Sequence, residues 1–106
     1  MTIGHWIDGQ PVTPSGEGAQ PVYNPATGEV IARLGLGTQA DVDRGVASAL
    51  AASARWAQVP VGKRAAVLFR FRELLVESTD ALAALVSREH GKVVSDARGE
   101  IARGLE

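Results

Sequence analysis

The sequence predicts an α+β fold in which two short β-hairpins precede three to four α-helices, within a single segment spanning residues 1–106. Two observations predict it. Residues 1–37 contain all but one of the five prolines and most of the glycines, so their short apolar runs are broken by turn residues. Residues 38–106 instead carry apolar side chains at helical spacing almost without interruption. The hydrophobic content of 45% and the charged content of 22% are ordinary for a globular protein.

The first predicted hairpin lies at the start of the chain. His5-Trp6-Ile7 is a short strand-like run that stops at Asp8-Gly9. Asp-Gly is a strong hairpin signal because both residues tolerate a positive φ. Residues 10–13 form the returning strand, and Pro11 confines that strand to the edge of a sheet because proline has no N–H to donate.

The second predicted hairpin joins residues 21–24 to residues 29–34. Its turn is Asn24-Pro25-Ala26-Thr27-Gly28. Proline presets φ for the second position of a type I turn, and Gly28 can take the left-handed conformation that closes it. This glycine is therefore structural. No phosphate-binding G-x-G-x-x-G motif follows a strand, and Gly35-Leu36-Gly37 is too short a match.

The first predicted helix begins at Thr38, a good N-cap residue, and Asp41 three residues later completes a carboxylate variant of the capping box. Trp56, near the end of this helix, is interpreted as a packing anchor. Pro60 ends the helix and opens the next one, because proline is tolerated in a first turn. The apolar stripe recurs at helical spacing and consists of Val42, Val46, Ala49, Leu50, Ser53 and either Trp56 or Ala57.

Three more helices are predicted after Pro60. Ser78 or Thr79 caps the third helix, and Gly91 ends it in the left-handed conformation. The fourth starts near Ser95, and its amphipathic pattern is still running at Leu105 and Glu106, so we expect the chain to belong to something longer. The apolar faces are Val67, Leu68, Phe71, Leu74 and Leu75 in the second helix, Leu82, Leu85 and Val86 in the third, and Ala97, Ile101 and Leu105 in the fourth.

Charge and composition exclude several classes of protein. Eleven basic and twelve acidic residues are interspersed, with a net charge of −1 and a pI near 6.1, so we expect no nucleic-acid partner. The densest basic group, which is Lys63, Arg64, Arg70 and Arg72, is interpreted as a solvated helix face. No apolar run reaches the ~20 residues of a membrane helix, and residues 1–6 lack the pattern of a secretion signal. We therefore expect a soluble, cytoplasmic protein with no membrane partner.

No catalytic, cofactor-binding or metal-binding residue is predicted. The absence of cysteine excludes disulfides, thiolate zinc sites and cysteine nucleophiles. His5 and His90 lack the further ligands that a metal site needs. His90 beside Glu89 is interpreted as a helix-capping or solvent-facing histidine in preference to half of an acid–base pair. The serines lie outside the G-x-S-x-G and S-x-x-K patterns of hydrolases.

Several motifs follow one another in a diagnostic order. They are His5-Trp6-Ile7-Asp8-Gly9, Asn24-Pro25-Ala26-Thr27-Gly28-Glu29-Val30-Ile31, Asp41-Val42-Asp43 at the start of the first helix, Trp56 at its end, Arg64 through Leu75, and Glu89-His90-Gly91-Lys92. Each motif is weak by itself. Their order and spacing together resemble the start of the aldehyde dehydrogenase superfamily along essentially the whole chain. This resemblance implies the N-terminal part of the α/β aldehyde dehydrogenase fold.

Residues 91–106 narrow the resemblance to one group of enzymes within the superfamily. Gly91-Lys92, the run from Ser95 to Glu100, and above all Arg103-Gly104-Leu105-Glu106 are similar to the methylmalonate-semialdehyde dehydrogenases. Those enzymes oxidise methylmalonate or malonate semialdehyde with NAD and pass the acyl group to coenzyme A. The resemblance thus implies NAD and coenzyme A for the parent enzyme, and no cofactor for this chain by itself. Succinate-semialdehyde and betaine-aldehyde dehydrogenases remain alternatives.

This chain differs from the family because it lacks counterparts of the family's catalytic residues, and this difference determines what we expect of the chain. In the family, a cysteine thiolate attacks the aldehyde, hydride passes to NAD, and water or a thiol resolves the thioester. This chain has no cysteine, and Asn24, which lies in a turn, is no candidate for the oxyanion-hole asparagine. We expect an inactive N-terminal segment that packs against the remainder of the parent enzyme or self-associates through an exposed apolar face. The alternative is a stand-alone binding or scaffold module derived from the same fold.

Overall fold

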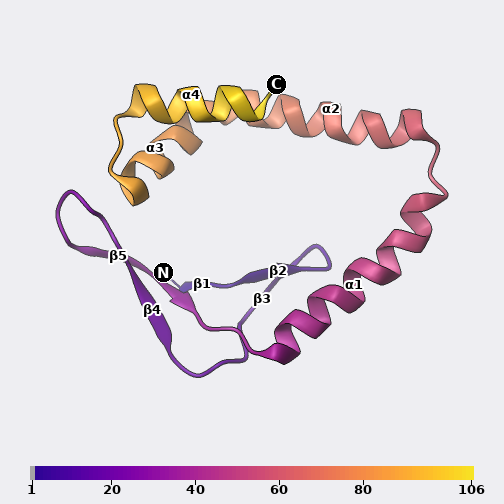
Figure 1. The fold of residues 1–106 in the computed structure, drawn as a ribbon, viewed down its shortest axis with the longest axis horizontal. Helices are drawn as coiled ribbons and strands as arrows, with labels where there is room; N and C mark the ends of the chain where they lie inside the picture. The colour runs from indigo at the N-terminus through magenta and orange to yellow at the C-terminus, as the bar shows by residue number, and fades with distance from the viewer. Residues whose placement is uncertain (1) are drawn as a thin grey trace. The chain divides into compact units, whose positions relative to one another are not determined.

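The structure, a computed structural model, describes residues 2–106 and divides into two compact units. Unit 1 consists of the residues up to Tyr23 together with Val30–Val59. Unit 2 consists of Asn24–Glu29 together with Pro60–Glu106. The elements run in the order of five strands followed by four helices, which confirms the predicted α+β class (Figure 1).

Unit 1 contains a three-stranded sheet in the order β1-β5-β4. The two long strands, β4 (Ala19–Tyr23) and β5 (Val30–Gly35), pair antiparallel as the second hairpin predicts. The short strand β1 (Thr2–Ile3) pairs with β5 in parallel, so that Thr2 lies opposite Arg33. The sequence carries no signal for β1, because two residues are too few to show an alternating pattern.

The first hairpin of unit 1 forms as predicted. Strand β2 (His5–Ile7) pairs antiparallel with β3 (Gln10–Val12), and Ile7 lies opposite Gln10. Both turn residues have a positive φ, 55° at Asp8 and 71° at Gly9. This is the combination that a two-residue type I′ turn requires.

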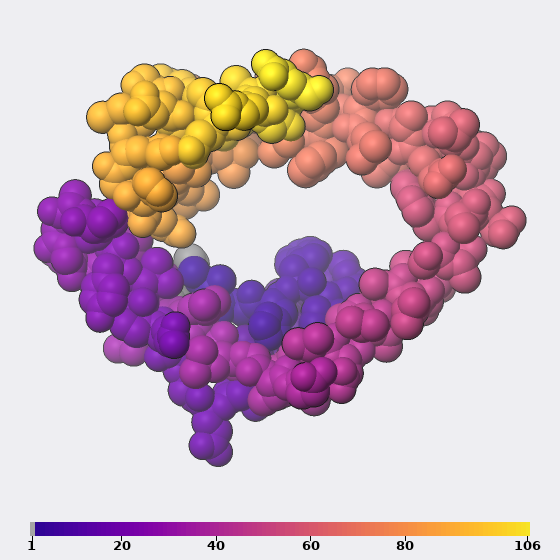
Figure 2. Space-filling model, in the orientation of Figure 1, coloured from indigo at the N-terminus to yellow at the C-terminus, as the bar shows by residue number. Residues whose placement is uncertain are grey.

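Helix α1 (Gln39–Ala57) completes unit 1 and opens with a capping box between Thr38 and Asp41. Its predicted apolar stripe remains largely exposed to solvent. Val42, Val46 and Leu50 are 57%, 53% and 68% exposed. On the face seen in Figure 2, no other segment of unit 1 covers the C-terminal half of α1. The stripe therefore has no partner within unit 1.

Unit 2 begins with the turn Asn24–Glu29, and local hydrogen bonds close this turn. Asn24 Oδ1 accepts a bond from the Ala26 N–H at 2.9 Å, and the carbonyl of Asn24 accepts one from the Gly28 N–H at 2.8 Å. Gly28 has a φ of 73°, which confirms its predicted left-handed conformation. The turn packs on the corner that follows α3, where a Cβ on Gly91 would lie 2.9 Å from Pro25 Cγ.

Three helices make up the rest of unit 2. They are α2 (Val61–Glu77), α3 (Thr79–His90) and α4 (Val94–Gly104). Helices α3 and α4 lie side by side, and each contributes one fully buried residue, Ala83 and Ala97 (Figure 1). Alanine at both positions lets the two helices approach closely, and an ion pair between Arg98 Nε and Asp80 Oδ1 at 2.9 Å spans them.

The start of α3 differs in one detail from the prediction. Ser78 occupies the N-cap position of α3, but its side chain makes no cap hydrogen bond. The Thr79 hydroxyl donates instead to the carbonyls of Leu75 and Val76 at 3.1 and 2.9 Å, where it satisfies the end of α2. After α4, Leu105 keeps a helical backbone conformation, and its N–H bonds the carbonyl of Ala102.

Only three apolar residues of the described chain are buried, and all are alanines: Ala32, Ala83 and Ala97. The larger apolar side chains of the helices remain partly or mostly exposed. Within residues 2–106, no helix combines the length and apolar character that crossing a membrane requires.

Gly91 provides a test of the α3–α4 corner. Its φ is 83°, and a methyl group there would meet Pro25, so we expect Gly91→Ala to lower the free energy of unfolding by about 1–3 kcal/mol. Gly99→Ala is the matched control, because it lies inside α4 with open space around it and should raise that free energy by about 0.5–1 kcal/mol. Urea unfolding followed by circular dichroism measures both. Equal effects of the two substitutions would contradict the described corner.

Candidate functional site

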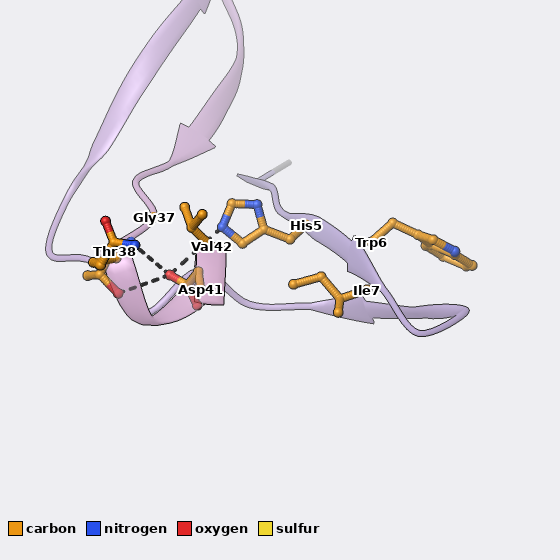
Figure 3. A pocket seen from close by; sticks show the side chains of 8 residues that line it. His5, Trp6, Ile7, Gly37, Thr38, Asp41 and Val42 are labelled. Carbon is orange, nitrogen blue, oxygen red and sulfur yellow. Dashed lines mark hydrogen bonds and ion pairs between the residues drawn. The ribbon is translucent and has the colours of Figure 1, made fainter. Parts of the chain in front are cut away.

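The best-defined polar site of the chain is the Asp41 carboxylate, at the start of α1 in unit 1. One oxygen, Oδ2, accepts hydrogen bonds from the N–H of Thr38 at 2.9 Å and from the N–H and hydroxyl of Ser15 at 3.0 and 2.8 Å. The hydroxyls of Ser15 and Thr38 also lie 2.7 Å apart. Asp41 thus joins the loop after β3 to the beginning of the helix, and Figure 3 shows its contact with Thr38.

These bonds stabilise the ionised form of Asp41. The backbone N–H groups of Ser15 and Thr38, followed by the Ser15 hydroxyl, lower the pKa of the carboxyl from 3.8 to about 2. The residue is buried, which opposes this shift but does not cancel it. The sequence identifies Asp41 as part of a capping box, but it does not identify Ser15 as a partner of Asp41, because a link across 26 positions leaves no local signal.

An open depression of about 480 Å³ adjoins this carboxylate. His5 and Ile7 of β2 point toward the start of α1, whereas the Trp6 side chain points away from it (Figure 3). His5 Nε2 lies 3.9 Å from Asp41 Oδ2 and is buried without a hydrogen-bond partner. That distance is beyond a hydrogen bond, so the two side chains do not form an acid–base pair. The remaining lining residues are Gly37, Thr38, Gln39 and Val42.

The start of α1 has the order of elements that a dinucleotide site uses. A strand, the run Gly35-Leu36-Gly37 and a helix follow one another here, and helix N-termini bind phosphate through free N–H groups. In this chain the Thr38 N–H already donates to Asp41, whose pKa its hydrogen bonds lower to about 2. The negative charge of Asp41 repels a phosphate group, so it makes the start of α1 an unfavourable position for a pyrophosphate.

The other sequence candidates do not converge on a site. His90 is exposed at the end of α3. Among residues 2–106, no group of three or more histidine, cysteine or acidic side chains could hold a metal ion. The members of the basic group have different surroundings: Arg70 pairs with Glu73 and Glu77 at 3.0 and 3.5 Å, whereas Arg72 Nε donates to the Leu105 carbonyl at 3.4 Å.

Exposed apolar surface is the more extensive feature of the chain. In unit 2, α2 carries a shallow depression of about 460 Å³ lined by Ala66, Val67, Arg70, Phe71 and Leu74. Phe71 is 57% exposed. In unit 1, Trp56 is 44% exposed, and its role as a packing anchor stays a prediction. Apolar patches of this kind mark surfaces that bind other protein elements.

Comparison with known proteins gives a consistent result. The model of the aldehyde dehydrogenase family matches residues 12–106. The malonate-semialdehyde dehydrogenase 2 of Bacillus mycoides is 45% identical over 106 residues, which is 100% of this chain and 22% of the relative. The malonate-semialdehyde dehydrogenase 3 of Geobacillus kaustophilus is 47% identical over 105 residues, which is 99% of this chain and 22% of the relative.

Solved structures agree with these relatives. A Sinorhizobium meliloti structure described as a methylmalonate-semialdehyde dehydrogenase complexed with NAD superposes with a TM-score of 0.95 and 42% identity, covering 99% of this chain and 21% of that chain. The methylmalonate-semialdehyde dehydrogenase of Oceanimonas doudoroffii gives a TM-score of 0.94 and 43% identity, covering 98% and 21%. The chain spans about a fifth of the length of the proteins that it matches.

The Asp41 site predicts a specific pH dependence. A carboxyl whose pKa falls from 3.8 to about 2 on folding stabilises the fold fully above about pH 4, and this contribution disappears as the pH falls toward 2. Asp41→Asn removes the titrating group. We therefore expect the difference in unfolding free energy between the unsubstituted chain and Asp41→Asn to be constant near neutral pH and to become smaller below about pH 4.

Urea unfolding at a series of pH values measures this difference. Asp43→Asn is the matched control, because Asp43 lies on the same helix and is exposed to solvent. A difference for Asp41→Asn that stays constant down to the lowest pH would contradict the described network.

Proposed function

This chain belongs to the aldehyde dehydrogenase family, and we propose that it is the N-terminal segment of a malonate- or methylmalonate-semialdehyde dehydrogenase. One observation carries the proposal. The semialdehyde dehydrogenases named above match essentially the whole of this chain at 42–47% identity, while the chain covers only 21–22% of their length.

The role proposed for the segment within that enzyme is structural. The chain has no cysteine, so it cannot supply the thiolate nucleophile of the family. Its buried carboxylate, Asp41, already accepts hydrogen bonds from Ser15 and Thr38. The exposed stripes of α1 and α2 instead provide surface against which the remainder of the enzyme packs.

We propose that the whole enzyme uses NAD and coenzyme A, and we assign the sites for both to its remaining four-fifths. The Sinorhizobium meliloti structure, which contains NAD, supports the first cofactor. Coenzyme A is proposed because the sequence of residues 91–106 is similar to methylmalonate-semialdehyde dehydrogenases. The charge of Asp41 at the start of α1 supports placing the NAD site outside this chain.

A chimeric enzyme tests the proposal. This chain would replace the matching segment of the Geobacillus kaustophilus relative, which is 47% identical to it. We expect the chimera to oxidise malonate semialdehyde with NAD at a rate within about tenfold of the parent enzyme, since tenfold corresponds to only about 1.4 kcal/mol. A folded chimera without this activity would overturn the proposal.

Substitutions on α1 identify the surface that assembly needs. Leu50→Asp places a charge in the exposed apolar stripe, and we expect it to lower the yield of active chimera at least about a hundredfold, because a buried unpaired charge is costly. Ala51→Asp is the matched control, because this residue is exposed and faces away from the stripe. Equal losses in the two variants would exclude the stripe as an interface.

The isolated chain provides a further test. Because its apolar stripes have no cover, we expect it to self-associate and to bind no NAD, which light scattering and calorimetry measure. A cooperatively unfolding monomer that binds a specific partner would support the alternative of a stand-alone module. Binding of NAD with micromolar affinity would overturn the assignment of the cofactor site to the rest of the enzyme.

A further inference from the structure

The β2–β3 hairpin has one open edge, and its geometry shows which backbone groups lie there. A two-residue turn makes the flanking residues, Ile7 and Gln10, a hydrogen-bonded pair. The next pair, Trp6 and Pro11, is therefore a non-hydrogen-bonded pair, in which the backbone groups of both residues point away from the hairpin. The N–H and the carbonyl of Trp6 thus face outward along β2.

Prolines interrupt two of the other edges. Pro11 lacks an N–H at the outward position of β3. Pro21 lacks one in β4, which is an edge strand of the three-stranded sheet. Strand β1 spans only Thr2–Ile3 and pairs with β5 at Arg33 and Leu34. Proteins block sheet edges with proline to prevent unwanted pairing, and β2 has neither a proline nor a charged side chain at Trp6, so its edge is open to pairing.

The hairpin also needs support that this chain does not provide. A hairpin of two strands is at best marginally stable, and a third strand or a packed helix is needed to hold it. Helix α1 approaches one face, toward which His5 and Ile7 point (Figure 3). Trp6 lies on the other face and is 72% exposed. Beside it, a depression of about 640 Å³ is lined by residues that include Trp6, Pro11 and Pro14.

We infer that an extended segment from the remaining four-fifths of the enzyme pairs with the open edge of β2, accepting a hydrogen bond from the Trp6 N–H and covering the Trp6 side chain. This inference rests on the proposed function, because it requires the rest of the polypeptide. It goes further by assigning the Trp6 edge as a strand-pairing site.

Size favours a segment of the same polypeptide over a second copy of the chain. Stable association of separate proteins buries about 800 Å² on each partner, and the three-residue edge of β2 is far smaller than that. A segment of the same chain is held at a high effective concentration, so a small edge suffices. The occupant is therefore an extended strand with an apolar side chain facing Trp6.

Two substitutions of Trp6 distinguish the contribution of its backbone N–H from that of its side chain. Trp6→Pro removes both the indole and the outward N–H, and it leaves the β2–β3 bonds intact, as Pro11 does opposite it. Trp6→Val removes the indole and keeps the N–H. In the isolated chain we expect the two variants to unfold at the same urea concentration. In the active chimera we expect Trp6→Pro to shorten the half-life of thermal inactivation at least about tenfold relative to Trp6→Val.

Hydrogen exchange gives a second readout that needs no substitution. In the unsubstituted chimera, the Trp6 amide should exchange at least about a hundredfold more slowly than in the isolated chain, while the Ile7 amide serves as the internal reference. Equal half-lives for the two variants, or a Trp6 amide that exchanges equally fast in both proteins, would overturn the inference. A loss confined to subunit association, with unchanged protomer stability, would assign the edge to a second copy and overturn it as well. An inactive unsubstituted chimera would instead refute the proposed function.

Discussion

Asp41 Oδ2 joins the loop after β3 to the start of α1, and the first turn of this helix depends on it. It accepts bonds from Ser15 on the loop after β3 and from Thr38 at the start of α1. Buried apolar contacts cannot replace it, since Ala32 is the one buried apolar residue of unit 1 among those described. The orientation of the first helix turn therefore depends on electrostatics and hydrogen bonding more than on hydrophobic packing.

The same scarcity of buried side chains explains why local sequence signals predict so much of the fold. Asp8-Gly9, Gly28 and Gly91 all adopt the left-handed conformations that their turn chemistry predicts. Pro60 separates α1 from α2 where the sequence places the break. These turns and helix breaks depend on a few neighbouring residues and do not require a tertiary core. Where backbone chemistry is sufficient to place an element, the sequence reveals that element.

Features that depend on long-range pairing could not be predicted. The parallel pairing of β1 with β5 joins Thr2 to Arg33, and the Ser15–Asp41 bonds span a similar distance in sequence. Neither leaves a periodic trace, because each involves only one or two residues on a side. The exposure of Val42, Val46 and Leu50 on α1 could not be predicted for a related reason. Helical spacing identifies an apolar face, but it does not show whether the chain also contains the surface that covers that face.

Helix α2 has one side on which charged residues form ion pairs in solvent. Arg70 bonds Glu73 and Glu77 along one stripe, and this is the side where charged residues pair with one another in solvent. Large apolar side chains occupy much of the remaining surface, with Arg64 and Arg72 between them: Val61, Val67, Leu68, Phe69, Phe71, Leu74, Leu75 and Val76. Most of these apolar side chains are exposed, so α3 and α4 bury only a small part of α2. The proposal that the remainder of the enzyme packs on this segment therefore has three independent supports, which are this surface of α2, the exposed stripe of α1 and the open edge of β2.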